Sequence, residues 1–150
     1  MPLDGESAPM FELPDQNEVT VSLASLEGRK VLVYFYPKAD TPGCTVQACA
    51  LRDVSGEVGD TAIVGISPDK PGRLKKFDDK YALGFTLLSD EDHAVAQAFG
   101  VWVEKQNYGK TYMGIQRSAF LIDETGTIER AWPKISPKDT PTNLLAALAG

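Results

Sequence analysis

The residues most able to do chemistry are the only two cysteines, Cys44 and Cys49, which lie five positions apart. Thr41 and Pro42 precede them and are typical of a helix N-cap and a first helical residue, so Cys44 should fall in the first turn. The free N–H groups and the positive dipole end of a helix start favour the thiolate form of a cysteine, which is the nucleophilic form. Cys44 is therefore a candidate nucleophile.

A disulfide between Cys44 and Cys49 would require a change of secondary structure. On a regular helix, five residues advance about 7.5 Å along the axis and turn by about 140°. This separates the two Cα atoms by more than the limit of roughly 7 Å for a disulfide formed without backbone movement. If Cys44 becomes a sulfenic acid, Cys49 can attack its sulfur only after the helix opens locally. The pair predicts a cycle that couples redox state to helix unwinding.

Other interpretations of the cysteines remain open from these residues alone. Cysteine is among the most buried residue types, so both could be inert members of a core helix. A zinc site is disfavoured, because zinc usually takes four ligands and the chain has two cysteines and one histidine. That histidine, His93, follows three acidic residues at an expected helix start. This position favours a solvated first-turn residue over the base of a cysteine protease.

Composition excludes several classes of protein. The chain has 150 residues, 43% of them hydrophobic, and we expect residues 1–150 to form a single domain. The net charge of −6, without a dense Lys/Arg cluster, argues against nucleic acid as a partner. No stretch approaches the roughly 20 apolar residues of a membrane helix, so we expect a cytoplasmic protein with no membrane partner. Two cysteines are too few for a secreted disulfide framework.

Short runs of β-branched and aromatic residues, bounded by charged or turn residues, predict the core strands. They cover 31–36, 62–66 and 119–122, with a further short strand over 86–88. Helical spacing of apolar residues predicts the helices. They cover 71–81 with a stop at Gly84, 92–99 with a stop at Gly100, and a last helix that begins at Thr140 and Pro141. The stretch 101–114 is predicted to be a long irregular loop.

Turn residues predict two hairpins. The run at 123–126 reads DETG, so strand 127–132 should pair antiparallel with the strand before it. Segments 11–13 and 19–21 flank PDQN and should form an N-terminal β-hairpin that covers one edge of the sheet. The order of elements predicts an α/β protein with a central mixed β-sheet flanked by helices on both faces. That arrangement is typical of a thioredoxin-like fold with insertions.

The segment from Tyr36 to Cys44 reads YPKADTPGC. It resembles the active-site pattern Pro-x-x-x-Thr/Ser-x-x-Cys of the peroxiredoxin family. The second cysteine five residues later is similar to the branch called bacterioferritin comigratory protein or PrxQ. The likeness continues through FGVW at 99–102, GKTY at 109–112 and GIQRSAFLID at 114–123. The chain departs from the family at Ala119, where Thr is frequent, and at Val103, where Gly is common, and neither is a reacting group.

The resemblance implies roles for five residues. Cys44 would be the peroxidatic thiolate, and Cys49 would be the resolving thiol. Pro37 would shield the pocket, while the Thr41 hydroxyl and the Cys44 N–H would hold the peroxide. Arg117 would supply a positive charge to the thiolate and the peroxide, although the residue types alone favour an edge-strand arginine that reaches solvent or an acidic neighbour.

The function that the resemblance implies is a thiol peroxidase for hydrogen peroxide and organic hydroperoxides. It would need no metal, haem or flavin, would be recycled by thioredoxin or a glutaredoxin-like dithiol, and would work as a monomer with an internal disulfide. A general thiol-disulfide oxidoreductase is a weaker alternative, because that chemistry prefers Cys-x-x-Cys spacing. A redox-sensing interaction protein is the non-enzymatic alternative, which would consume peroxide stoichiometrically rather than catalytically.

Overall fold

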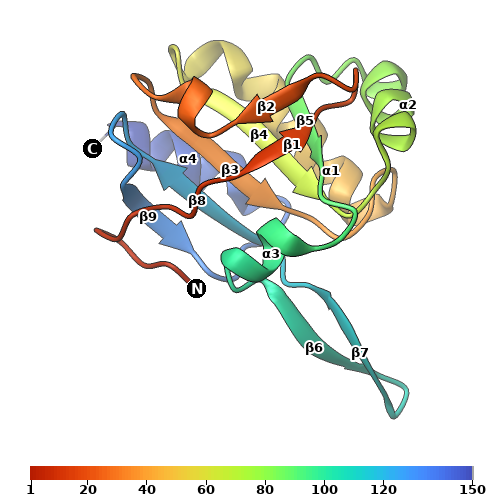
Figure 1. Cartoon of the computed structure of the whole chain (residues 1–150). Coiled ribbons are helices and arrows are strands. Elements are labelled where there is room, and N and C mark those ends of the chain that lie inside the picture. Colours follow the sequence, from red (N-terminus) through yellow and green to blue (C-terminus); the bar gives the residue numbers. More distant parts are fainter. Residues whose placement is uncertain (150) are drawn as a thin grey trace.

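A five-stranded mixed sheet forms the centre of the computed structural model, which describes residues 1–149 (Figure 1). Its strands, in spatial order, are β5 (Thr86–Ser89), β4 (Ala62–Ser67), β3 (Val31–Phe35), β8 (Ser118–Ile122) and β9 (Ile128–Trp132). β3, β4 and β5 run parallel, while β8 is antiparallel to β3 and β9 is antiparallel to β8. The predicted central mixed sheet and its closing β8–β9 hairpin are confirmed.

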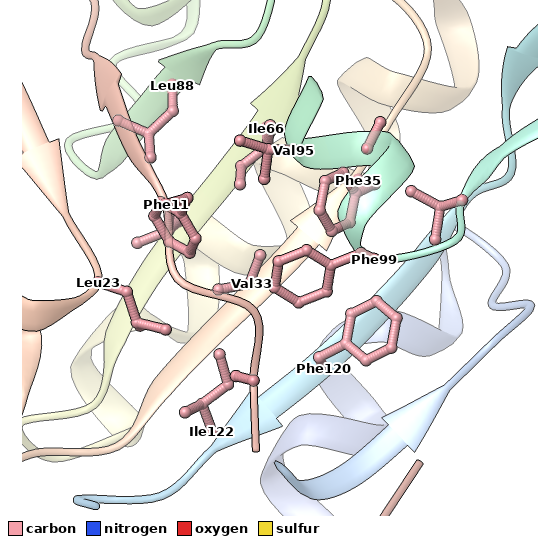
Figure 2. Packing of buried hydrophobic residues seen from close by; sticks show 14 of the residues in the cluster. Phe11, Leu23, Val33, Phe35, Ile66, Leu88, Val95, Phe99, Phe120 and Ile122 are labelled. Carbon is pink, nitrogen blue, oxygen red and sulfur yellow. The ribbon is translucent and has the colours of Figure 1, made fainter. Parts of the chain in front are cut away.

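One face of the sheet, here called the phenylalanine face, is covered by the N-terminal segment and the short helix α3 (Ala94–Ala98). Alternate residues of β3 point to this side, including Val33 and Phe35, because side chains of a strand alternate between its two faces. Phe35 packs against Phe99 with ring centroids 5.1 Å apart, and Phe99 packs against Phe120 at 5.2 Å. These rings form the middle of the cluster in Figure 2.

The opposite face, here called the thiol face, is covered by three helices: α1 (Pro42–Val54), α2 (Pro71–Tyr81) and α4 (Asp139–Ala149). The intervening β3 residues Leu32 and Tyr34 point to this side, together with Cys44 from α1. Trp132 of β9 is partly buried against the same cluster, with the Arg130 guanidinium 5.6 Å from its ring centroid. Helices therefore lie on both faces, as the sequence predicted.

The predicted N-terminal hairpin is present as β1 (Glu12–Pro14) and β2 (Thr20–Ser22). It meets the β5 edge of the sheet through a β-bridge between Asp15 and Leu88. The Gln16 side chain donates to the carbonyl of Phe85 at 2.9 Å and accepts from the N–H of Leu87 at 3.0 Å. The hairpin thus protects the open edge strand, as expected.

The prediction of an irregular loop over 101–114 is wrong. The segment forms an antiparallel hairpin of β6 (Trp102–Asn107) and β7 (Lys110–Ile115), which projects away from the sheet in Figure 1. Its two turn residues, Tyr108 and Gly109, have φ angles of 52° and 77°. Left-handed residues at both positions match the tight turn that suits a twisted two-stranded ribbon, but tyrosine is a rare choice for it.

One helix start and one helix stop signal differ from the prediction. α3 begins at Ala94 rather than at residue 92, and His93 before it is left-handed with φ 62°. His93 is half-buried and stacks on Trp102 with ring centroids 3.8 Å apart, so it is not a solvated first-turn residue. α2 covers 71–81 as predicted, but the left-handed residue that ends it is Ala82 rather than the expected Gly84.

The remaining elements are two short 3₁₀ helices, η1 (Ala24–Leu26) and η2 (Ser55–Glu57). Over residues 1–149, no helix combines the length and the apolar character needed to cross a bilayer.

Candidate active site

The first turn of α1 holds the candidate nucleophile. Thr41 is the extended N-cap residue, and its carbonyl accepts the bond from the Thr45 N–H at 2.8 Å. Cys44 lies before that bond, so its own N–H belongs to the group of first-turn donors that face outward from the helix end. The Thr41 hydroxyl donates to the carbonyl of Lys38 at 2.8 Å instead of capping the helix. The predicted helix start is confirmed, with the side chain of the cap turned into the preceding loop.

Arg117 and Cys44 meet although 73 positions separate them in the chain. Arg117 directly precedes β8, and its Nη2 donates to Cys44 Sγ at 3.3 Å. The Cys44 side chain lies in the thiol-face cluster with a residue exposure of 1%. A guanidinium at this distance stabilises a sulfur anion, and water screens little of the interaction at a buried site.

Gly43 makes the close approach of the arginine possible. A Cβ atom at this position would lie 3.3 Å from Arg117 Nη2 and 3.6 Å from Cγ of Pro137. The guanidinium would have to move by a few tenths of an ångström to accept a side chain, whereas the distance to Pro137 is an ordinary contact. The glycine between the proline and the cysteine therefore leaves room for the cation.

Gln47 is a site residue that the sequence reasoning missed. It lies three residues after Cys44 on the same side of α1 and is fully buried. Its Oε1 accepts from Arg117 Nη1 at 2.6 Å, and its Nε2 donates to Thr140 Oγ1 of α4 at 2.9 Å. Thr140 in turn donates to the carbonyl of Ser136 at 2.8 Å. The spacing of three residues from the cysteine was the available signal, since a buried glutamine needs partners.

The loop that leads into α1 is tied to the start of α2. Asp69 Oδ2 accepts from the Ala39 N–H at 2.7 Å, and Arg73 Nη2 donates to the Ala39 carbonyl at 2.9 Å. Asp69 and Arg73 also form an ion pair at 3.2 Å. Both backbone groups of Ala39 are therefore held by one charge pair, which fixes the loop next to Thr41.

Asp40 provides a second tie between this loop and α2. It is left-handed, with φ 62°, and its carboxylate accepts from Lys80 Nζ at 3.0 Å and from the Tyr81 hydroxyl at 2.9 Å. The hydrogen bond from Lys80, followed by that from Tyr81, lowers the pKa of Asp40 below its ordinary value. The loop conformation thus depends on contacts made by side chains far along the chain.

The other predicted site residues lie nearby with fewer contacts. Pro37 is exposed at the start of the loop, so its shielding role stays a prediction. Cys49 is half-buried on α1, packs against the thiol-face cluster and is unpaired, as is Cys44. Both sulfurs belong to one intact helix, which agrees with the expectation that a bond between them needs unwinding.

Two tyrosines of β3 and its continuation lie under α1. Tyr34 and Tyr36 are almost fully buried, and their rings stack with centroids 5.4 Å apart. Loss of contact with water through burial raises the pKa of both hydroxyls, so both are neutral at physiological pH. Gly65 of β4 leaves space for Tyr34, because a Cβ there would lie 2.8 Å from Tyr34 Cζ.

Comparison with known proteins shows the family to which the chain belongs. A model of the AhpC/TSA family matches residues 5–131. Peroxiredoxin Bcp of Escherichia coli strain K12 is 56% identical over 130 residues, which cover 85% of this chain and 83% of the relative. This chain is a Bcp-type peroxiredoxin. A putative peroxiredoxin of Haemophilus influenzae is 55% identical over 137 residues, 90% of this chain and 88% of the relative.

Solved structures resemble this peroxiredoxin along almost its whole length. The bacterioferritin comigratory protein of Xanthomonas campestris, described for its alkyl peroxide reduction activity, superposes with a TM-score of 0.88 at 33% identity. The match covers 93% of this chain and 90% of the other. A PrxQ mutant of Xylella fastidiosa gives a TM-score of 0.92 at 26% identity, covering 99% and 96%. The thioredoxin-like fold and the peroxidase class of this peroxiredoxin are thereby established.

Proposed function

We propose that this peroxiredoxin reduces hydrogen peroxide and organic hydroperoxides through a sulfenic acid on Cys44. The observation that supports this most is the hydrogen bond of 3.3 Å from Arg117 Nη2 to Cys44 Sγ. It joins a cation to a cysteine that lies in the first turn of a helix, where a thiolate is favoured on its own. The same guanidinium has further N–H donors for an oxygen of a peroxide bound at the sulfur.

In the first step, the thiolate sulfur of Cys44 bonds to one peroxide oxygen and the O–O bond breaks. The bonding electron pair leaves with the second oxygen, which departs as hydroxide or alkoxide and takes a proton to become water or an alcohol. Arg117 and the Cys44 N–H stabilise the charge that develops on these oxygens, and the Thr41 hydroxyl joins them by turning its proton away from the Lys38 carbonyl. Pro37 and the tied loop keep bulk water away from the thiolate.

In the second step, the Cys49 thiol attacks the sulfenic sulfur, which releases water and forms a Cys44–Cys49 disulfide. The first two turns of α1 must unwind for this step, and they bury only Cys44, Gln47 and Ala48. Small and polar side chains lose little apolar burial when they open, so the helix is suited to local unfolding.

The cycle closes when a dithiol donor reduces the disulfide and is itself oxidised. We assign this role to thioredoxin or a glutaredoxin-like protein of the cytoplasm. Because the disulfide is internal, a monomer is sufficient for the whole cycle, with the chain acting as one domain.

The experiment that tests this proposal is a mass measurement with a thiol count, before and after one equivalent of hydrogen peroxide. The expected result is a monomer that has lost two hydrogens and both free thiols. A gain of one oxygen with one thiol remaining would remove Cys49 from the cycle. A disulfide-linked dimer would contradict the internal bond.

A further inference from the structure

The side chain of one lysine in the projecting hairpin lies over the neighbouring strand. Lys105 of β6 pairs in register with Tyr112 of β7, yet its aliphatic chain lies over Gly114, two residues further along β7. A Cβ on Gly114 would lie 3.2 Å from Lys105 Cδ and 3.5 Å from its Cε. The glycine is therefore the surface on which the lysine chain rests, and Lys105 is half-buried while its neighbours Glu104 and Gln106 are exposed.

The Lys105 side chain is directed toward the end of the hairpin that is nearer to the candidate active site. β7 runs from the hairpin tip at Lys110 to its base at Ile115, and Arg117 follows two residues later. By leaning from Tyr112 toward Gly114, Lys105 extends toward the base of the hairpin and so toward Arg117.

The electrostatic environment of Lys105 agrees with this direction. Burial lowers the pKa of its ammonium below the ordinary value, the nearby Arg117 charge lowers it further, and the charge of Cys44 acts in the opposite sense. The charges of Arg117 and Cys44 therefore both act on the Lys105 ammonium. Within residues 1–149, no carboxylate forms an ion pair with it.

We propose that Lys105 is a second cation of the peroxide site, which faces Cys44 and Arg117 from the β6–β7 hairpin. This inference rests on the proposed role of Cys44. The charge of Arg117 balances that of the thiolate, so the ammonium of Lys105 gives the site a net charge of about one positive unit. That charge stabilises the thiolate and the hydroxide or alkoxide that leaves when the O–O bond breaks.

The test measures the second-order rate constant for oxidation of Cys44 by hydrogen peroxide, in a Cys49→Ser background so that only the first step is observed. Quenched-flow mixing followed by alkylation of the remaining thiol gives this rate directly. Hydrogen peroxide is uncharged, so long-range attraction of the substrate does not enter the comparison. Lys105→Met removes the charge and keeps the aliphatic contact with Gly114, while Lys105→Arg keeps the charge. Lys110→Met is the matched control, because it removes the same charge from the exposed tip of the hairpin.

We expect Lys105→Met to slow the oxidation by about tenfold, the order of effect of one partly screened unit charge near a reacting group. Lys105→Arg should restore most of the rate, and Lys110→Met should change it less than twofold. Added salt should reduce the difference in oxidation rate between the parent and Lys105→Met, because salt screens the charge.

Several outcomes would overturn the inference. They are an unchanged rate in Lys105→Met, an equal loss in Lys105→Met and Lys105→Arg, and an equal loss in Lys105→Met and Lys110→Met. Lys105→Gln serves as a second neutral variant if the methionine variant melts at a lower temperature than the parent. Failure of the proposed function is distinguishable, because Cys44→Ser would then still reduce peroxide whatever residue stands at position 105.

Discussion

The two faces of the central sheet are built for different tasks. The phenylalanine face is filled by large rings from distant parts of the chain, including Phe11, Phe35, Phe99 and Phe120. The thiol face also buries large side chains, including Tyr34 and Phe77, but the first two turns of α1 contribute only Cys44, Gln47 and Ala48 to it. Large apolar side chains lose much free energy when they are exposed, whereas small and polar ones lose little. We infer that both faces supply stability, and that the proposed opening is confined to the first two turns of α1 on the thiol face, where little apolar surface is buried.

The strongest test of this division is the pair of cysteine variants. Cys44→Ser should abolish peroxide turnover, because serine provides no thiolate at neutral pH. Cys49→Ser should still be oxidised once per chain and then stop as a sulfenic acid. Peroxide consumption with a dithiol donor, together with the mass of the oxidised protein, measures both. Equal activities in the two variants would show that the roles are assigned wrongly.

Removal of a ring from the phenylalanine face should affect stability rather than chemistry. Phe99→Ala should lower the free energy of unfolding by about 3–5 kcal/mol, the usual cost of a large cavity in a core. The rate of Cys44 oxidation in the folded protein should stay within twofold of the parent. Urea unfolding and rapid-mixing oxidation check the two parts, and a large fall in the oxidation rate would break the separation of the faces.

Arg117→Ala should affect the oxidation rate more than the free energy of unfolding, the reverse of Phe99→Ala. Loss of the guanidinium removes a donor to both the sulfur and the peroxide, so the oxidation rate should fall by about 100-fold. Its free energy of unfolding should change much less than that of Phe99→Ala. Arg117→Lys is the control that keeps the charge but not the paired donors, and we expect it to be intermediate. A rate equal to that of the parent would make Arg117 a structural residue.

Gln47 acts through Arg117 and should give a smaller effect. Gln47→Ala leaves Arg117 Nη1 without its acceptor, and we expect the oxidation rate to fall by about tenfold. Gln47→Glu keeps an acceptor oxygen for Arg117 but adds a negative charge close to the thiolate, so it should oxidise no faster than Gln47→Ala, which a role confined to packing would not predict. A second measurement is the rate of disulfide formation. It should be faster in Gln47→Ala, because the hydrogen bond from Gln47 of α1 to Thr140 of α4 is lost.

The smallest expected effect concerns the loop before α1 and depends on pH. Lys80 and Tyr81 lower the pKa of Asp40 in the folded protein, so this contact stabilises the fold above the ordinary pKa of an aspartate. The contribution disappears as the pH falls through the lowered folded-state value. Asp40→Asn should therefore melt slightly below the parent at pH 7, and the two should converge in acid. Asp60→Asn, also exposed, is the control that should show no such convergence.

Much of the fold could be predicted, because the strands and helices of the two faces have distinct apolar patterns. The run at 31–36 alternates between the faces, and the Thr-Pro pair marks the start of α1. The first turn also identified Cys44 without any structural information. These signals are local, so single segments of sequence contain them.

The β6–β7 hairpin and its lysine could not be predicted in the same way. The ribbon packs little of its surface on the sheet, so its strands lack the apolar alternation by which strands are recognised. Its turn uses Tyr108 in a conformation that most sequences reserve for Gly or Asn. The contacts of Gln47 with Thr140 and of Lys105 with Gly114 depend on tertiary packing, which periodicity does not record.

The position of the two tryptophans gives each face its own built-in fluorophore. Trp132 borders the thiol-face cluster and should change its emission when α1 unwinds. Trp102 packs on the phenylalanine face against His93 and should keep its emission through the same event. Two variants, each with one tryptophan replaced by phenylalanine, would therefore each carry a single fluorophore. The emission of Trp132 would report movement at the thiol face, and that of Trp102 would serve as the reference from the phenylalanine face.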